Sequence, residues 1–428
     1  MAAPRERRAP PTLAPPAHLP APPSTLDELD IPESLLYDLA LRHVSTRSFI
    51  TIQLLAQQLR LPLELTEQLF RRLNEHQYLE VRRMSGEDYV FSLSPSGRKL
   101  AAERAQASRY MGPAPVSLRA WSAIVRDQVA RIDVTRERLR RAFHDIIVDD
   151  RLLDALGPAL ISQNAIFLHG ASGTGKSTVA ERLVRVFEDA IVVPWAIEVE
   201  GQIVSVADLA VHERVDFEEI DLRRDVDPRW MICRRPFLSV GGELVTGMLD
   251  LSHDEVHGCF TAPLQMKANN GILLIDDFGR QMSSPRDLLN RWIVPLDRRV
   301  DFLTLGSGGK FDIPFELQVV FSTNLEPREL ADEAFLRRIP NKILLEAVGP
   351  EPFDRIFRMT ASAAGLSLEP GSEQVLRELC LRHSPDLRPC FPRDICNAIR
   401  AITIYEHRPP VITRLDLQRA VAGYFVTR

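Results

Sequence analysis

The sequence predicts an α/β fold built on a parallel sheet, with a smaller helix-and-hairpin domain before it and a helical domain after it. Two observations support this prediction. A glycine-rich stretch, residues 170–178, lies between an apolar run at 165–168 and an amphipathic run at 179–187, as in a strand–loop–helix unit. Two more apolar runs, at 272–275 and 317–321, are followed by polar residues, and such runs are typical of strands buried on both faces of a parallel sheet.

The glycine-rich stretch fits the phosphate-binding pattern G-x-x-x-x-G-K-[ST] at every fixed position. Its glycines let backbone N–H groups surround phosphate oxygens, and the helix that follows adds the positive end of its dipole. We expect Lys176 to reach the β- and γ-phosphates of ATP, and the Ser177 hydroxyl to bind Mg²⁺. Only five of the 53 basic residues are lysines, and one stands here. The predicted nucleotide-binding residues are Gly170, Ala171, Ser172, Gly173, Thr174, Gly175, Lys176, Ser177 and Thr178.

Length and composition indicate a soluble globular protein of two or three domains. The chain has 428 residues, 45% of them hydrophobic and 26% charged, and its net charge of −5 gives no overall attraction to nucleic acid. Five cysteines without C-x-x-C spacing favour reduced thiols. No apolar run has the length of a membrane span, and no apolar segment follows the basic residues at 5–8. We therefore expect a cytoplasmic location, no secretory signal and no membrane insertion.

The N-terminal region divides into a tail and a small domain. Residues 1–24 are rich in Pro and Ala, which predicts a disordered or polyproline tail. Residues 25–105 contain three helical runs, then a hairpin pattern at 79–93 and a further helix that starts at Ser94. We expect Thr51 to cap the second helix. The three helices and the hairpin resemble a winged helix-turn-helix domain, with residues 64–76 as its recognition helix.

The charges of this domain do not decide between two partners. The recognition-helix candidate carries Glu64, Glu67 and Glu75 against Arg71 and Arg72. A nearly neutral face is a weak match to DNA phosphates, so DNA binding through residues 25–105 and docking of a protein both stay open. Residues 106–144 are expected to form a Pro/Gly linker and one helix from about 118 to 144. An ATP-binding core at 145–350 and a helical lid at 351–428 follow.

Acidic and amide side chains follow two of the predicted central strands. Asp276 and Asp277 come directly after the run at 272–275, and the carboxyl ends of parallel strands are where such sheets bind ligands. Asp276 is expected to hold Mg²⁺, and Asp277 to polarise the attacking water. Asn324 ends the strand at 317–324 and is expected to orient that water or contact the γ-phosphate.

Three arginines complete the predicted site. Arg337 and Arg338 lie between a helix and a predicted edge strand at 342–345, where one of them is a candidate arginine finger for ATP held by a neighbouring subunit. A solvated basic helix end is the alternative. Arg393 begins a helix in the C-terminal segment, from which it can reach back to the phosphates, and the nearby Arg388 is a weaker candidate.

These features, in this order, resemble the AAA+ ATPases over about two-thirds of the chain. The resemblance implies a five-stranded parallel sheet, a helical lid, and homo-oligomeric rings with ATP at subunit interfaces. It identifies Lys176 and Ser177 with Walker A, Asp276 and Asp277 with Walker B, and Asn324 with sensor 1. It further identifies Arg393 with sensor 2, and Arg338 with the finger, Arg337 being the reserve.

One departure from the family concerns the rate. The family has Asp-Glu at Walker B, whereas this chain has Asp276-Asp277. The shorter carboxylate lies about 1.5 Å further from the same target, and a catalytic base must be within hydrogen-bond reach. Hydrolysis is therefore expected to be slow, unless the backbone compensates for the shorter side chain. An ATP-binding scaffold with very slow turnover is one alternative that follows.

Two strand-rich additions narrow the resemblance. Strand patterns at 191–206 and a hairpin pattern at 299–315 interrupt the core. These additions resemble those of the AAA+ branch that includes the MoxR-type chaperones. Residues 110–115 and 275–281 resemble a bacterial group of predicted ATPases with chaperone activity, associated with Flp pilus assembly. We therefore expect a chaperone-like ATPase that remodels or switches an unknown protein partner. A DNA-binding regulator or loader is the rival.

Overall fold

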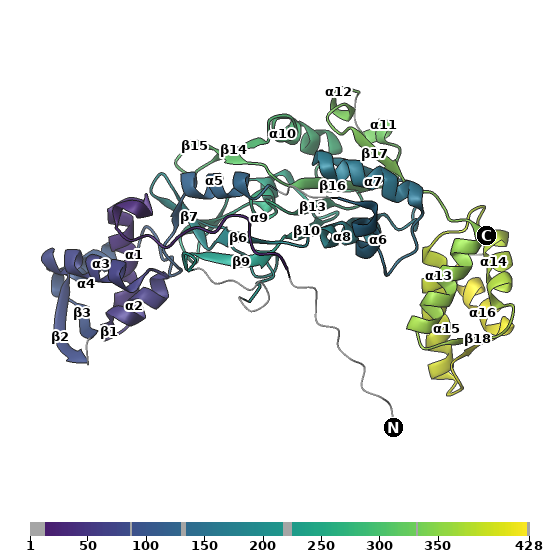
Figure 1. The fold of residues 1–428 in the computed structure, drawn as a ribbon, viewed down its shortest axis with the longest axis horizontal. Coiled ribbons are helices and arrows are strands. Elements are labelled where there is room, and N and C mark those ends of the chain that lie inside the picture. The colour runs from purple at the N-terminus through teal and green to yellow at the C-terminus, as the bar shows by residue number, and fades with distance from the viewer. Residues whose placement is uncertain (1–12, 86–87, 130–133, 217–224, 331–332, 426–428) are drawn as a thin grey trace.

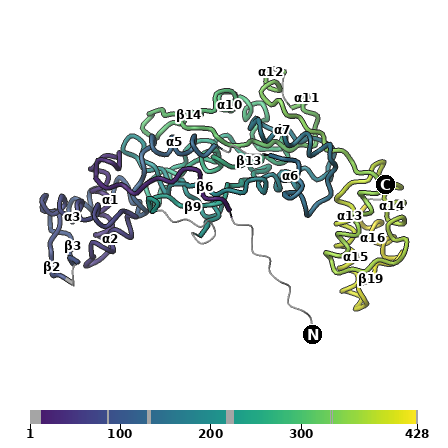
Figure 2. The backbone as a smooth tube through the Cα atoms, viewed as in Figure 1, coloured from purple at the N-terminus to yellow at the C-terminus, as the bar shows by residue number. Residues whose placement is uncertain are grey.

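Three groups of elements follow one another along the longest axis of the molecule (Figure 1). The structure is a computed structural model, and it describes residues 13–85, 88–129, 134–216, 225–330 and 333–425. Figures 1 and 2 place the N-terminal helices and β1–β3 at one end, the two five-stranded sheets in the middle and the C-terminal helices at the other end. Within these ranges no helix combines the length and the apolar character that a membrane crossing requires.

The N-terminal domain combines helices with a three-stranded antiparallel sheet of order β1-β3-β2. Its elements are α1 (Glu33–Ser45), β1 (Ile50–Thr51), α2 (Ile52–Leu59), α3 (Leu63–Glu75), β2 (Leu79–Ser85), β3 (Asp88–Leu93) and α4 (Pro95–Arg104). The side chains of Thr51 and Ser94 accept hydrogen bonds from the first turns of α2 and α4, so both predicted helix starts are confirmed. The β2–β3 hairpin is also found, with residues 86–87 of its turn outside the described ranges.

The segment before this domain is a packed strap where it is described. The side chain of Leu13 is buried in the apolar core of the middle region. The backbone of Ala14 accepts a hydrogen bond of 2.9 Å from Ala190, because proline-rich segments keep their carbonyl acceptors even where they lack N–H donors. Leu13 and Ala14 are thus held by packing and by backbone pairing, which fits the extended alternative better than the disordered one, and residues 1–12 lie outside the described part.

A five-stranded sheet with only parallel neighbours forms the middle of the molecule, as predicted. Its order is β10-β13-β16-β5-β17. The strands are β5 (Ile166–His169), β10 (Phe237–Val240), β13 (Ile272–Ile275), β16 (Gln318–Thr323) and β17 (Asn341–Leu344). Four of the five were expected from the sequence, and the edge strand β10 was not.

Alternate residues of this sheet face two separate apolar cores. On one face the rings of Phe167, Phe278 and Phe321 contact one another beneath α10 (Pro285–Arg298). The other face packs against α7 and α8, whose bounds are Asp150–Ser162 and Lys176–Leu183. Because both faces are covered, the loops at the carboxyl edge are where this sheet can present polar side chains to a ligand.

A second, mixed sheet lies between the parallel sheet and the N-terminal domain (Figure 1). Its order is β11-β12-β8-β7-β4. Its strands are β4 (Val116–Ser117), β7 (Ala196–Val199), β8 (Gln202–Ser205), β11 (Ser252–Asp254) and β12 (Cys259–Thr261). Two strand pairs adjoin it, β6 (Ala190–Pro194) with β9 (Trp230–Arg234), and β14 (Val300–Thr304) with β15 (Lys310–Pro314). The strand patterns predicted at 191–206 and 299–315 are thus confirmed.

The single helix expected between about 118 and 144 is wrong, because two helices occupy this stretch. They are α5 (Leu118–Asp127) and α6 (Arg136–Ala142). The buried side chain of Gln128 ends α5 by bonding to the backbone of Val192 in β6, where its Oε1 accepts from N at 2.6 Å and its Nε2 donates to O at 3.1 Å. Thr135 then caps α6. Residues 130–133 lie outside the described part.

The N-terminal domain is joined to the second sheet by packing as well as by the chain. Their apolar side chains form one continuous cluster that includes Ala196 and Ile203 of the sheet. The guanidinium of Arg60 lies 4.4 Å from the ring centroid of Trp195, and Ala114 N donates to Leu59 O at 2.9 Å. The predicted linker is therefore a structured joint that also supplies strand β4.

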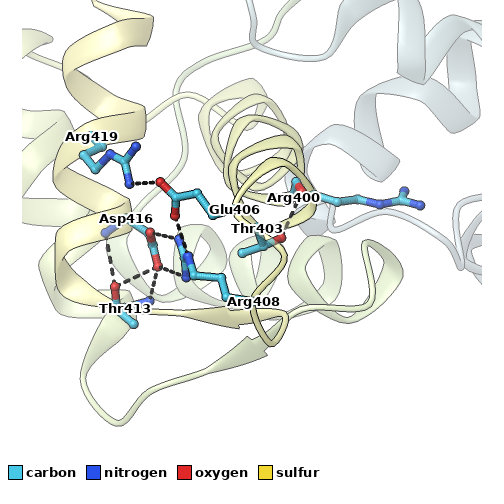
Figure 3. Close-up of polar contacts among 7 residues, drawn as sticks. All are labelled: Arg400, Thr403, Glu406, Arg408, Thr413, Asp416 and Arg419. Carbon is cyan, nitrogen blue, oxygen red and sulfur yellow. Dashed lines mark hydrogen bonds and ion pairs between the residues drawn. The ribbon is translucent and has the colours of Figure 1, made fainter.

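The C-terminal region is helical, with a two-stranded pair between its helices. Its elements are α13 (Pro350–Ala363), β18 (Ser367–Leu368), α14 (Ser372–His383), α15 (Cys390–Tyr405), β19 (Val411–Ile412) and α16 (Arg414–Tyr424). Figure 3 shows how the turn between α15 and α16 is fixed: Arg408 donates to Glu406 and Asp416, and Arg419 donates to Glu406. Asp416 and Thr413 form a reciprocal capping box at the start of α16.

Candidate nucleotide-binding site

The glycine-rich loop runs from the end of β5 to the first turn of α8, at the carboxyl edge of the parallel sheet. Gly170, Gly173 and Gly175 have φ values of 138°, 81° and 94°, a region that favours glycine. Gly175 is the N-cap of α8, so the helix begins with Lys176. A Cβ atom at Gly170 would overlap the carbonyl oxygen of Leu345. The loop therefore needs glycine at these positions, because of their positive φ values and, at Gly170, because no Cβ atom fits.

Lys176 is buried beneath this loop and makes three hydrogen bonds. The residue is only 6% exposed, and its Nζ donates to Gly170 O and Ala171 O at 2.9 Å each. The third bond, of 2.6 Å, is to Oδ1 of Asn324. Burial lowers the pKa of Lys176, whereas the charges of Asp276 and Asp277 raise it.

Asn324 connects the lysine to the acidic pair. It directly follows β16, and its Nδ2 donates to Oδ1 of Asp277 at 3.3 Å. Asp276 and Asp277 directly follow β13, which neighbours β16, and Asp277 N donates to Oδ1 of Asp276 at 3.0 Å. The structure thus brings together Lys176, Asp276, Asp277 and Asn324, four residues that come from three adjacent strands.

The donor set at this place suits Mg²⁺. Ser177 is half-buried in the first turn of α8, and the Asp276 carboxylate lies at the end of β13. Hydroxyl and carboxylate oxygens are the ligands that Mg²⁺ takes in proteins, with the remaining positions filled by water and substrate phosphates. Thr174 donates within the loop, to Ala171 O at 3.0 Å. Ser177 and Asp276 would therefore hold the ion, whereas Thr174 stabilises the turn.

The C-terminal helices touch the loop through Arg388 and Cys390. Nη1 of Arg388 donates to Ser172 O at 3.1 Å, and Cys390 N donates to Gly173 O at 3.3 Å. A Cβ atom at Gly173 would overlap the Cys390 sulfur, so the contact is close. From the sequence alone Arg388 is a weaker candidate than Arg393, and no motif points to Cys390, the first residue of α15.

Arg393 lies one turn into α15 and is placed differently. Its side chain is 65% exposed, and its Nε lies 3.4 Å from Oδ1 of Asp394. Its role as a lid arginine therefore stays a prediction. Of Arg388 and Arg393, Arg388 is the one that contacts the glycine-rich loop in the described structure.

The two finger candidates lie at the opposite edge of the sheet. Both come between α12 (Glu333–Leu336) and the start of β17, which runs parallel to β5. The loop follows the carboxyl end of β5, so residues before β17 lie at the far edge from it. Nε of Arg338 donates to Oδ2 of Asp297 at 2.7 Å. Arg337 is exposed, and its side chain makes no hydrogen bond or ion pair with the described residues.

Comparisons with known proteins find one family of unknown function that matches part of the chain, and solved structures of low similarity. Residues 349–423 match a family described as a domain of unknown function, DUF8689. No curated protein matches. Solved structures that resemble this chain include NtrX from Brucella abortus, at 14% identity and a TM-score of 0.40, over 65% of this chain and 57% of that one.

Two mutant forms of RuvB from Thermotoga maritima are also similar in structure. They are 11% and 12% identical, with TM-scores of 0.39 and 0.38. Each match covers 65% of this chain, and 71% or 70% of the RuvB chain. Likenesses at this level say nothing of activity, whose assignment has to come from the site itself.

Proposed function

We propose that this chain is an ATP hydrolase of the AAA+ class that acts as a homo-oligomer on a protein partner. The observation that carries the proposal is the chain of hydrogen bonds from Lys176 through Asn324 to Asp277, beside Asp276 and at the mouth of the glycine-rich loop. In this proposal Lys176 is the cation that binds phosphate, Asp276 is a ligand of Mg²⁺ and Asp277 is the carboxylate that accepts a proton, and their proximity in one network supports these roles. A turn that only binds nucleotide does not need the proton-accepting carboxylate of Asp277, so its presence supports hydrolysis.

In this proposal the chemistry is positioning and charge stabilisation. Backbone N–H groups of the loop and Lys176 bind the phosphates, and bound Mg²⁺ would offset their negative charge and orient the γ-phosphate. Asn324 holds the Asp277 carboxylate toward the site, from which it can take a proton from the attacking water. Arg388, which bonds to Ser172, links the helical domain to the same loop.

Phosphate release from MgATP tests the proposal, with binding measured separately by calorimetry. Lys176→Ala should abolish binding, because the buried ammonium is the loop's phosphate contact. Asp277→Asn should keep binding but lower turnover by about 100-fold or more, the usual contribution of a general base. Asp312→Asn, at an exposed carboxylate on β15, is the control. Equal turnover in Asp277→Asn and the unaltered chain would refute the assignment, and binding without hydrolysis in the unaltered chain would favour the scaffold.

The finger is assigned to Arg337, ahead of Arg338, within this proposal. Arg338 is bound to Asp297 of its own chain, whereas the Arg337 side chain is exposed at an edge of the sheet remote from its own loop. An arginine so placed can reach ATP only on another subunit. Turnover per chain should then rise with protein concentration, and Arg337→Ala should remove that rise. Turnover independent of concentration would contradict the interface.

A protein partner is favoured over DNA by the ion pairs of α3. Arg71 pairs with Glu67 at 3.5 Å and Arg72 with Glu33 at 3.6 Å, so both basic residues of the helix have acidic partners. DNA affinity rests on phosphate neutralisation and falls steeply with salt. Binding of a DNA duplex by the full chain, weakening steeply as salt rises, would instead support the DNA-binding regulator.

A further inference from the structure

The backbone of the Asp276–Asp277 turn is held by a side chain outside the predicted site, that of Gln281. Its Nε2 donates to the carbonyl oxygens of Asp276 at 2.9 Å and Asp277 at 3.2 Å. Its Oε1 accepts from Gly279 N at 2.8 Å. One amide therefore binds three peptide groups within four consecutive residues, and both of its polar ends are used.

The turn that Gln281 closes contains a residue in the left-handed region. Asp277 has φ of 48°, in the left-handed region that L-residues other than Gly, Asn and Asp avoid. Such a conformation persists only where surrounding contacts fix it. On the other side of the turn, Phe278 N donates to Ser322 O and Thr323 Oγ1 donates to Phe278 O, both at 2.7 Å. The turn is thus tied to β16 on one side and to Gln281 on the other.

This geometry sets the direction of the Asp277 side chain. With its φ fixed, the carboxylate accepts from Asn324, which in turn accepts from Lys176. Without Gln281, the carbonyl of Asp276 loses its side-chain donor, and the carbonyl of Asp277 keeps only Arg280 N, at 3.0 Å. The turn is then held less tightly, and Asp277 can return to the right-handed or extended region, which turns its carboxylate away from Asn324. Gln281 itself makes no described contact with Lys176 or Ser177.

We infer that Gln281 is a positioning residue for the Asp277 carboxylate: its amide fixes the left-handed turn that aims this base at the phosphate site. The effect on turnover rests on the proposed ATP hydrolysis. The effect on the turn does not, because the hydrogen bonds belong to the protein alone.

Two measurements on the full chain test the inference. Hydrogen exchange of the nucleotide-free protein should show faster exchange across residues 276–282 in Gln281→Leu than in the unaltered chain. In steady-state kinetics with MgATP, Gln281→Leu should lower kcat by about 10- to 100-fold, as small displacements of a reacting group do. The KM for ATP should change by less than about threefold, because the groups that bind phosphate are not moved.

Two further variants make the result decisive. Met282→Ala alters the neighbouring side chain, which is 80% exposed, and should change neither exchange nor kcat. Gln281→Glu keeps an acceptor for Gly279 N but loses both donors, so it should reproduce the fall in kcat even if Gln281→Leu does not fold. Unchanged exchange across 276–282, or unchanged kcat in both Gln281 variants of a chain that hydrolyses ATP, would overturn the inference. If the unaltered chain binds ATP without hydrolysing it, the proposed function fails, whereas the exchange result still decides whether Gln281 holds the turn.

Discussion

At the scale of single residues, the left-handed backbone of Asp277 gives a reason for the Asp-Asp pair. Asp is among the few residues that adopt this conformation readily, whereas Glu is not. We therefore predict that Asp277→Glu does not speed hydrolysis, although its carboxylate reaches further. In Asp277→Glu the left-handed backbone should also lower the free energy of unfolding by about 1 kcal/mol relative to the unaltered chain. Phosphate release and thermal unfolding measure both effects. Faster turnover at unchanged stability would show that reach alone limits the reaction.

The residues of the site could be predicted only where a motif fixes their spacing. Lys176, Asp276 and Asn324 each follow or precede a recognisable apolar strand, so their meeting at one sheet edge follows from parallel topology. Gln281 and Arg388 lie in irregular segments, and their contacts depend on turn geometry and on docking of a separate domain. The sequence therefore offers Arg388 only as a weaker candidate and gives no indication of the role of Gln281.

At the scale of elements, prediction succeeded for buried strands and for capped helices. Apolar runs identified β5, β13 and β16, and Ser94 and Thr51 marked helix starts. Predictions failed where tertiary contacts override local pattern. The helix expected at 118–144 is divided by the bond between Gln128 and β6, and the proline-rich strap gains partners from β6 that its composition does not reveal.

The start of α16 offers a test at this scale. Thr413 Oγ1 accepts from Asp416 N at 3.2 Å, and the Asp416 carboxylate accepts from Thr413 N at 3.1 Å. Thr413→Ala removes this cap and should destabilise the C-terminal helices by about 1 kcal/mol, the usual value for an N-cap. Denaturant unfolding measures the change. Thr413→Ser, which keeps the hydroxyl, should lie near the unaltered chain, and equal losses in both variants would contradict the role of the cap.

At the scale of the whole molecule, buried histidines predict a dependence of stability on pH. Burial lowers the pKa of His43, His169 and His212, which lie in the N-terminal domain, at the end of β5, and before β9. A lowered pKa in the folded state means that the unfolded chain binds protons more readily. Stability should therefore fall as pH drops below about 6.5, the unperturbed value, toward the lower folded pKa values.

Thermal unfolding at pH 7.5 and 5.5 checks this prediction, since carboxylates contribute mainly at lower pH. His212 is informative because its Nε2 lies 2.9 Å from Lys267 O and its Nδ1 accepts from Asp208 N, an arrangement that fits the neutral ring. His212→Gln should reduce the difference in Tm between the two pH values. A Tm that rises on acidification would contradict the prediction.

The joint between the N-terminal domain and the second sheet has a mechanical consequence. The two parts share one apolar cluster and a cation–π contact between Arg60 and Trp195. We therefore expect them to move together as one rigid arm rather than as two domains joined by a flexible linker. Figure 1 shows the hairpin β2–β3 at the outer end of this arm, remote from α8 and the loop that precedes it. Under the proposed function, a small rotation of the parallel sheet on nucleotide binding would move the distant hairpin much further than it moves residues close to the sheet.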